Sequence, residues 1–355
     1  MKIGRVALDH PVALAPMAGM TDTAFRRLVK RMGGCGLVVT EMVSSEGLVR
    51  GIDRTLEYAE YTEEERPVSI QIFGGDPHVM AEAARVVEGM GADIVDINMG
   101  CPVPKIAKHN AGCSLMREPQ HAAEVVRAMV QAVQIPVTVK MRAGWNEHEI
   151  NAPELARLVE DAGASAVAVH GRTAAQSYTG ESDWSLISRV AQSVTIPVFG
   201  SGDCVEAGQV VSRTSSPGVS GVLVGRGALR NPWIFRQAAQ AGSGGTPTPV
   251  SLAERGRFLI EYIDLLLDEI GSERAGFRHT APGQQAAGVP ARGRERWVIN
   301  KLRALGSWYT KGLEDGSHLR VAINSTDSIP QLRRIIEDFF AIGSEDSATA
   351  VAAAE

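Results

Sequence analysis

The sequence contains no apolar run long enough to span a lipid bilayer, and its first residues contain no apolar segment ahead of a small-residue cleavage site. These absences argue against a membrane-spanning protein and against a secretory signal peptide. Cysteine is scarce: four occur in 355 residues, and none form a C-x-x-C pair, so neither a zinc knuckle nor a thioredoxin-like motif is indicated. We therefore expect a cytoplasmic protein with no metal site and no membrane contact.

The sequence also lacks an excess of positive charge. Its formal net charge is -5, which argues against indiscriminate binding of nucleic acid. The charge is unevenly distributed, however, because residues 271–320 contain nine Lys or Arg and four Asp or Glu. A basic segment on an acidic body can bind a polyanion, although a solvated helix face is the commoner origin of such a cluster.

Short apolar runs alternate with helical patterns over most of the chain. Eight runs have the length and residue types of buried strands, at 12–15, 37–40, 67–72, within 93–102, and at 135–141, 166–170, 196–199 and 221–224. Alternation of strands and helices indicates a parallel sheet. Eight such units within about 240 residues favour a (β/α)8 TIM barrel over a doubly wound sheet.

The last third of the chain has a different pattern. Residues 241–249 are rich in Gly, Ser, Thr and Pro, which is typical of a linker. Helical periodicity follows at 259–270, 296–309 and 329–340, whereas 274–293 predicts a long loop or partly disordered insertion. We expect a barrel domain over 1–242, a small all-α helical domain over 250–342 and a disordered tail over 343–355.

Polar and glycine-rich positions follow the predicted strands, where barrel enzymes keep their active sites. Gly202-Asp203 and Gly225-Arg226 follow the seventh and eighth strands, where barrels commonly bind phosphate. We favour a phosphate site here over two ordinary tight turns.

Lys140, His170 and Arg172 lie at the ends of neighbouring strands. A lysine in a barrel mouth needs an anionic partner, such as a phosphate or the electron-rich edge of a reduced flavin. A solvent-exposed lysine and a core histidine are the plainer interpretations of each residue alone, but the three together favour a site. Gln71 ends the third strand and could hydrogen-bond the edge of a ring.

Cys101 directly follows the fourth strand, on which Asp96 and Asn98 share one face. Three roles are open to this thiol. It could be a nucleophile with His170 or His109 as its base, a general acid that delivers a proton, or a structural core residue. The residues alone do not decide among these roles.

Taken together, these motifs resemble the tRNA-dihydrouridine synthases, flavin-dependent barrel enzymes that reduce uridine in tRNA. The matching segments fall in the family's order along the barrel: A-P-M-A-G-M-T-D at 15–22, T-E-M at 40–42, Q-I-F-G at 71–74, N-M-G-C-P at 98–102, V-K-M-R at 139–142, H-G-R-T at 170–173, G-S-G-D at 200–203 and G-R-G at 225–227. Each segment alone is weak, whereas the ordered set is highly specific. The W-Y-T-K-G segment at 308–312 also resembles the tRNA-binding domain of the bacterial branch.

The resemblance implies that FMN lies across the barrel mouth and is bound by two groups of residues. The ring and the ribityl side would meet Pro16, Met17, Ala18, Gln71, Lys140 and His170. The phosphate would be held by Ser201, Gly202, Asp203, Gly225 and Arg226.

The resemblance also implies the reaction. NADPH, or NADH, would reduce the flavin, and a uracil extruded from tRNA would stack on it. Hydride would pass from flavin N5 to uracil C6, while Cys101 would donate a proton to C5. A thiol pKa near 8.5 leaves the group mostly protonated at neutral pH, which favours the acid role for Cys101. Asn98 would orient the uracil, Arg172 would lie near substrate or flavin, and the enzyme would be a monomer or weak dimer.

Two features depart from the family pattern, and two other functions compete. Many members have Arg-Lys-His shortly before the Trp-Tyr pair, where this chain has Arg-Ala-Leu at 303–305, and the segment 274–293 is unusually long.

The first competing function is that of a flavoenzyme acting on a free pyrimidine, similar to dihydroorotate dehydrogenases, but such an enzyme would need no basic extension. A non-catalytic tRNA-binding protein would need neither Cys101 nor Lys140. Removal of the residues from 250 onward should weaken tRNA binding and leave FMN bound.

Overall fold

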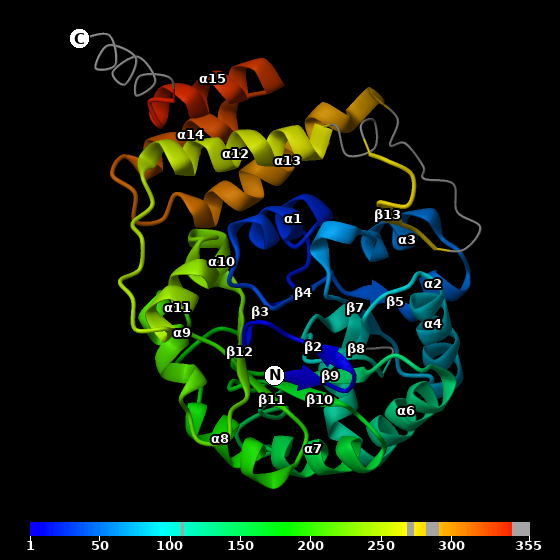
Figure 1. Ribbon diagram of the computed structural model, residues 1–355. Coiled ribbons are helices and arrows are strands. Elements are labelled where there is room, and N and C mark those ends of the chain that lie inside the picture. Colours follow the sequence, from blue (N-terminus) through cyan, green and yellow to red (C-terminus); the bar gives the residue numbers. More distant parts are fainter. Residues whose placement is uncertain (108–109, 268–272, 282–290, 343–355) are drawn as a thin grey trace.

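The computed structural model describes residues 1–107, 110–267, 273–281 and 291–342. Within these residues, eight parallel strands close into a barrel (Figure 1). They are β3 (Val12–Leu14), β4 (Leu37–Val39), β7 (Val68–Phe73), β8 (Ile94–Met99), β9 (Val137–Arg142), β10 (Ala166–His170), β11 (Val198–Ser201) and β12 (Gly221–Val224). Pairing of β12 with β3 and of β4 with β7 closes the ring. The predicted TIM barrel is thus confirmed, with its strands in the predicted order.

The barrel strands are buried on both faces, which explains why their sequences are nearly continuous apolar runs. Helices cover the outside: α1 (Thr23–Met32), α2 (Ser45–Val49), α3 (Asp53–Ala59), α4 (Pro77–Gly89), α6 (Pro119–Ala132), α7 (Ala152–Asp161), α8 (Trp184–Ser193), α9 (Ala207–Thr214), α10 (Arg226–Arg230) and α11 (Ile234–Gly242). Capping side chains and proline fix where such helices begin, as α4 illustrates. The Asp76 carboxylate accepts hydrogen bonds from two backbone N–H groups at the start of α4, and Pro77 follows it.

The end of the barrel at which the strands begin is closed by a hairpin of β1 (Lys2–Ile3) and β2 (Val6–Ala7). Ile3 and Leu8 belong to the same apolar cluster as side chains at strand starts, including Leu37, Ile94 and Ala166. The barrel interior is thus filled with apolar side chains at this end, whereas the polar residues that follow the strands lie at the opposite end. There β5 (Val43–Ser44), α5 (Pro104–Ala107) and the 3-10 turn η2 (Gly112–Arg117) extend from the strand ends.

The C-terminal helices α12 (Leu252–Leu267), α13 (Ala291–Tyr309), α14 (Gly316–Ser325) and α15 (Ile329–Phe339) lie together beside α1 (Figure 1). The ring of Phe25 on α1 is 6.1 Å from that of Phe258 and 6.3 Å from that of Tyr262 on α12. The helical region therefore shares its apolar core with the barrel. Helix α14 was not predicted, and α13 begins earlier than predicted; the predicted tail at 343–355 lies outside the described residues.

Part of the predicted loop at 274–293 is an ordered strand. The strand β13 (Arg278–His279) pairs antiparallel with β6 (Tyr61–Thr62), which leads into the 3-10 turn η1 (Glu63–Glu65). The His279 ring stacks on the Tyr61 ring with their centroids 4.6 Å apart. The loop prediction is wrong for this part, because the strand is held by a partner more than 200 residues away. Residues 282–290 of the insertion lie outside the described part.

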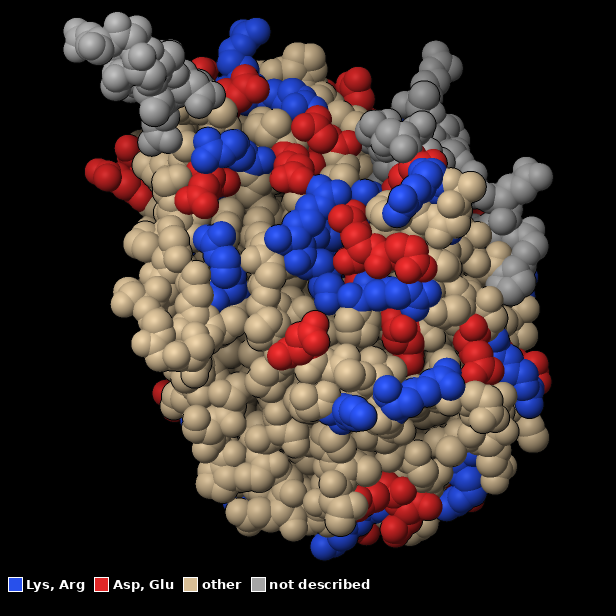
Figure 2. Space-filling model, in the orientation of Figure 1, with Lys and Arg blue, Asp and Glu red and all other residues tan. Residues whose placement is uncertain are grey.

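The basic residues of the C-terminal region are interleaved with acidic ones. Figure 2 shows Lys and Arg beside Asp and Glu over the junction of the helical region and the barrel. Ion pairs between the segment 271–320 and acids of the barrel include Arg278 with Glu60 and Lys301 with Asp22. Part of the basic excess at 271–320 is therefore neutralised within the fold. None of the helices in the described part of the chain combines the length and apolar character needed to cross a membrane.

Candidate active site

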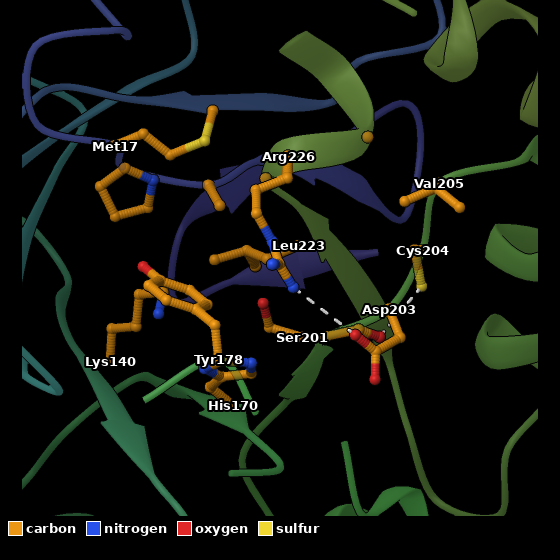
Figure 3. Close-up of a pocket in the computed structure, with 15 residues that line it drawn as sticks. Met17, Lys140, His170, Tyr178, Ser201, Asp203, Cys204, Val205, Leu223 and Arg226 are labelled. Atoms are coloured by element: carbon orange, nitrogen blue, oxygen red, sulfur yellow. Dashed lines mark hydrogen bonds and ion pairs between the residues drawn. The ribbon is translucent and has the colours of Figure 1, made fainter. Parts of the chain in front are cut away.

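A cavity of about 120 Å³ opens at the ends of the barrel strands (Figure 3). Nine of the residues singled out from the sequence line it: Pro16, Met17, Lys140, His170, Ser201, Gly202, Asp203, Gly225 and Arg226. The remaining lining residues are Ala15, Tyr178, Cys204, Val205, Leu223 and Gly227. Ala18 is exposed and is not among the lining residues.

The loops after β11 and β12 form one side of this cavity. Gly202 has a φ of 125°, and a Cβ at this position would come within 2.5 Å of Ser182 atoms, so a glycine is required. Asp203 also has a left-handed φ, of 55°. The Arg226 guanidinium lies 3.6 Å from the Asp203 carboxylate and is about one-third exposed. A cationic side chain therefore reaches the cavity beside two glycine-rich loops, which suits an anion.

Arg172 lies behind the cavity wall. Its guanidinium donates to both Asp203 carboxylate oxygens at 2.9 Å and to the carbonyl oxygens of Thr179 and Gly180. It also lies 3.4 Å from Nε2 of His170. Because its side chain is buried and these bonds occupy it, Arg172 positions Asp203 and the loop after β10.

Tyr178 is a cavity residue that we did not identify from the sequence. It lies in the loop that Arg172 holds and is 58% exposed. Its ring lies 4.7 Å from the Arg226 guanidinium carbon and 5.7 Å from that of Arg142. An exposed aromatic ring between two cations can stack on a planar, electron-rich group. The feature of the sequence that could have identified Tyr178 is an aromatic residue in the loop that follows a barrel strand.

Lys140 and His170 face the cavity from the neighbouring strands β9 and β10. Burial and the charge of Arg142 lower the pKa of Lys140 to about 8, against the opposing effect of Asp96. Burial and the charges of Lys140, Arg142 and Arg172 lower the pKa of His170 far below its usual range. The histidine is therefore neutral at pH 7, whereas most of the lysine is charged.

A chain of hydrogen bonds crosses three neighbouring strands beneath the cavity. In strand register Asp96 is opposite both Gln71 and Thr138. The Gln71 amide and the Thr138 hydroxyl donate to the two Asp96 carboxylate oxygens at 2.7 and 2.6 Å. The Asn98 amide donates to the Gln71 carbonyl at 2.7 Å. Asp96 thus fixes the orientation of the Gln71 amide, although Gln71 is buried and does not line the cavity.

Asn98 extends this chain to Cys101. Its side-chain oxygen accepts hydrogen bonds from the backbone N–H groups of Gly100 and Cys101 at 3.1 and 2.9 Å. The thiol of Cys101 is only partly buried. The turn after β8 is therefore set by Asn98, which presents Cys101 at the strand end.

The electrostatics of Cys101 favour the protonated thiol. Burial raises the pKa of Cys101, although a backbone N–H and the charges of Arg142 and Lys140 act in the opposite direction. Among the described residues, no histidine contributes to this shift; His109, one candidate base, lies outside them. A protonated thiol can donate a proton but is a poor nucleophile.

The match to protein families agrees with this geometry. Residues 13–288 match the model of the family described as "Dihydrouridine synthase (Dus)". The chain belongs to the dihydrouridine synthase family. The matched segment contains all of the barrel strands except the first residue of β3, together with α12. Membership makes the chain an oxidoreductase.

Relatives of the synthase cover between 82% and 96% of its length. A "Probable tRNA-dihydrouridine synthase" of Rickettsia conorii is 36% identical over 342 residues, which is 96% of each chain. One of Rhodobacter capsulatus is 42% identical over 82% of this chain and 91% of its own. "tRNA-dihydrouridine synthase B" of Pseudomonas aeruginosa is 39% identical over 85% of this chain and 92% of its own. The likeness therefore extends beyond the barrel into the helical region.

A solved structure resembles the synthase in fold. The "Crystal structure of TcOYE with pHBA" superposes with a TM-score of 0.50 at 12% identity, over 70% of this chain and 94% of that one. At this identity the likeness concerns the barrel fold alone.

Proposed function

We propose that this synthase binds FMN, takes reducing power from NADPH or NADH, and reduces a uridine of tRNA to 5,6-dihydrouridine. The observation that carries the proposal is one cavity in which a cationic, glycine-rich wall adjoins Lys140 and His170, with the Cys101 thiol at a neighbouring strand end. Relatives named tRNA-dihydrouridine synthase support the choice of substrate.

The donor set suits FMN. An anionic phosphate fits the wall formed by Ser201, Gly202, Gly225 and Arg226, because these residues combine close backbone approach with a cation. In this assignment Asp203 positions the Arg226 guanidinium. When bound, the reduced flavin supplies the hydride that adds to uracil C6.

The ring side of the cavity is assigned to Met17, Lys140 and His170. The Lys140 ammonium would stabilise negative charge at the polar edge of the ring. The neutral His170 adds no second charge there. Gln71 lies one layer below, so its part in this assignment is to support Asn98 and the strand ends.

Cys101 is assigned as the proton donor to uracil C5. Its raised pKa keeps the thiol protonated at pH 7, and the Asn98 oxygen fixes the backbone that carries it. General acids of this kind contribute about 100- to 10,000-fold to a rate. Asn98 is assigned to orienting the uracil as well as the turn, and Arg172 to positioning the loop that carries Tyr178.

The substrate is proposed to be tRNA, with the base turned out of its stack to reach the cavity. Exposed aromatic and cationic side chains of the helical region, including Trp297 and Lys311, suit stacking and phosphate contact. All four cysteines, each within the described part, are free thiols, which fits the reducing cytoplasm as the proposed compartment.

The test uses the full chain, FMN, NADPH and an unmodified tRNA transcript, with dihydrouridine measured by mass spectrometry of the nucleosides. We expect dihydrouridine at one site or a few sites, and none from free uridine or orotate. The Cys101→Ala variant should keep bound FMN and its reduction by NADPH but form dihydrouridine at least about 100-fold more slowly. The matched control is Cys113→Ala, because this neighbouring thiol is fully buried and cannot reach a substrate, whereas Cys101 is only partly buried. A colourless protein that binds no FMN, or preferential turnover of free pyrimidine, would refute the proposal.

A further inference from the structure

The peptide of Gly19 is held at its N–H by Glu41 and at its carbonyl by Lys301, two charged side chains. Gly19 lies in the loop between β3 and α1, with a left-handed φ of 79°. Its N–H donates to Oε2 of Glu41, which follows β4. Its carbonyl oxygen accepts a hydrogen bond of 3.0 Å from the ammonium of Lys301, which lies on α13. Thus a side chain of the helical region reaches a loop of the barrel mouth.

Lys301 is surrounded by anionic groups of the barrel. Its ammonium lies 3.0 Å from an Asp22 carboxylate oxygen and 3.5 Å from a Glu41 oxygen. The three side chains are 13%, 13% and 7% exposed, so the charges are largely removed from water. Although burial acts in the opposite direction, Asp22 and Glu41 raise the pKa of Lys301. The ammonium is therefore a stable cation at the centre of this cluster.

The loop held by this cluster also forms part of the cavity. Pro16 and Met17 line the cavity. The N–H of Met17 donates to the Thr21 hydroxyl, and the N–H of Thr21 donates to the Met17 carbonyl, each at 3.1 Å. Met17 and Gly19 thus belong to one tight turn, so a shift of the Gly19 peptide moves the cavity wall.

We propose that Lys301 is a positioning residue that fixes the loop 16–19 in the shape required by the flavin site. The flavin site therefore depends on how the helical region packs against the barrel. The inference rests on the proposed FMN site. It gives Lys301 a role different from that expected of the basic segment at 271–320, because its ammonium faces barrel carboxylates.

Two properties of the cluster support this role over simple surface pairing. Glu41 contacts both Gly19 and Lys301, so loss of the ammonium leaves that carboxylate buried beside an uncompensated Asp22. The Asp22 carboxylate also caps α1 through the Phe25 N–H and accepts from the Tyr262 hydroxyl at 2.8 Å. Without the lysine, these two carboxylates would repel each other with no cation between them. One of them is bonded to the loop at Gly19 and the other to the start of α1.

The test compares Lys301→Met with Arg334→Met in the full-length protein. Both changes remove one positive charge from the helical region, but Arg334 is an exposed residue of α15. The dissociation constant of FMN is measured by titrating each apoprotein and following flavin fluorescence. We expect Lys301→Met to weaken FMN binding about tenfold, with Arg334→Met unchanged and Lys301→Arg retaining most of the affinity, because a guanidinium also pairs with carboxylates.

Hydrogen–deuterium exchange of the apoproteins gives a second readout that needs no flavin. We expect Lys301→Met to raise exchange in peptides covering 16–22 while peptides from β9 and β10 keep their protection. Unchanged exchange at 16–22, or a uniform rise across the barrel, would overturn the positioning role. If the unaltered chain binds no FMN, the proposed function fails, and the exchange comparison still decides whether Lys301 holds the loop.

Adding Glu41→Gln separates the ion pair from general packing. A glutamine keeps an acceptor for the Gly19 N–H but removes the charge that needs Lys301. We expect Lys301→Met to cause a smaller loss of FMN affinity in the Glu41→Gln background than in the unaltered chain. Additive losses in the double variant would contradict a shared cluster.

Discussion

The charge of Lys140, which faces the cavity, changes at a pH slightly above neutral. Its pKa of about 8 means that the ammonium is present below this pH and is lost as the pH rises through it. Affinity for the anionic FMN should therefore fall as the pH rises from 7 to 9, by up to about tenfold, which corresponds to about 1.4 kcal/mol. Titrations of FMN into the apoprotein at several pH values would measure this decline.

Two substitutions at Lys140 isolate this effect. Lys140→Met should bind FMN more weakly at pH 7 and show little change between pH 7 and 9. Lys140→Arg should also show little change, because a guanidinium stays charged, but should bind more tightly than the methionine variant. The same decline in all three proteins would assign the pH dependence to another group.

Residue types at strand ends could be predicted from the sequence, whereas their contacts could not. Lys140, His170 and Arg226 each follow or end a strand, and barrel closure brings them to one cavity. Asp96 was visible as a polar residue on a buried strand, but its bonds to Gln71 and Thr138 depend on strand register. Register is fixed by the closed barrel as a whole.

At the scale of elements, α1 is tied to the barrel by a buried arginine. Arg26 donates to Glu65 at 2.5 Å and to the carbonyl oxygens of Thr21 and Glu60 at 2.6 and 2.8 Å. Both charged side chains are at most 1% exposed. Burial raises the pKa of Glu65, and Arg26 opposes that shift.

We expect Arg26→Met to lower the free energy of unfolding by about 3–5 kcal/mol, because it leaves a buried carboxylate without its partner. The control is Arg31→Met on the same helix, where the arginine is 38% exposed and an exposed pair contributes about 0–1 kcal/mol. Urea unfolding of both variants would measure the difference. Equal losses of unfolding free energy in the two variants would show that burial of the Arg26–Glu65 pair adds nothing to stability.

Elements with strong internal periodicity could be predicted, and those defined by distant partners could not. Helix α15 occupies Ile329–Phe339, close to the predicted 329–340, because its apolar positions repeat and Ser328 caps it. The strand β13 contains two residues and is formed by pairing with β6. Helix α14 begins at Gly316 after a left-handed Asp315, a start that resembles a turn in the sequence.

At the scale of the whole molecule, the helical region and the barrel share one apolar core. Phe25 of the barrel helix α1 is fully buried, and its ring contacts are with Phe258 and Tyr262 of α12. Each large apolar side chain that loses such burial costs about 1.5–3 kcal/mol. The sequence predicts that the barrel keeps FMN without the helical region, whereas this shared core and the Lys301 cluster predict that FMN binding weakens when the region is removed.

Truncation after Pro249 should therefore lower the melting temperature of the barrel and weaken FMN binding, besides abolishing most tRNA affinity. The cause can be separated with Phe258→Ala in the full chain, which removes apolar contact and keeps Lys301 in the sequence. We expect this variant to melt earlier but to retain more FMN affinity than the truncated chain. Calorimetry with FMN titration and a tRNA gel-shift assay would measure all three effects. A truncated barrel with the melting temperature and FMN affinity of the full chain would contradict the shared core, because removal of α12 would then have cost the barrel no stability.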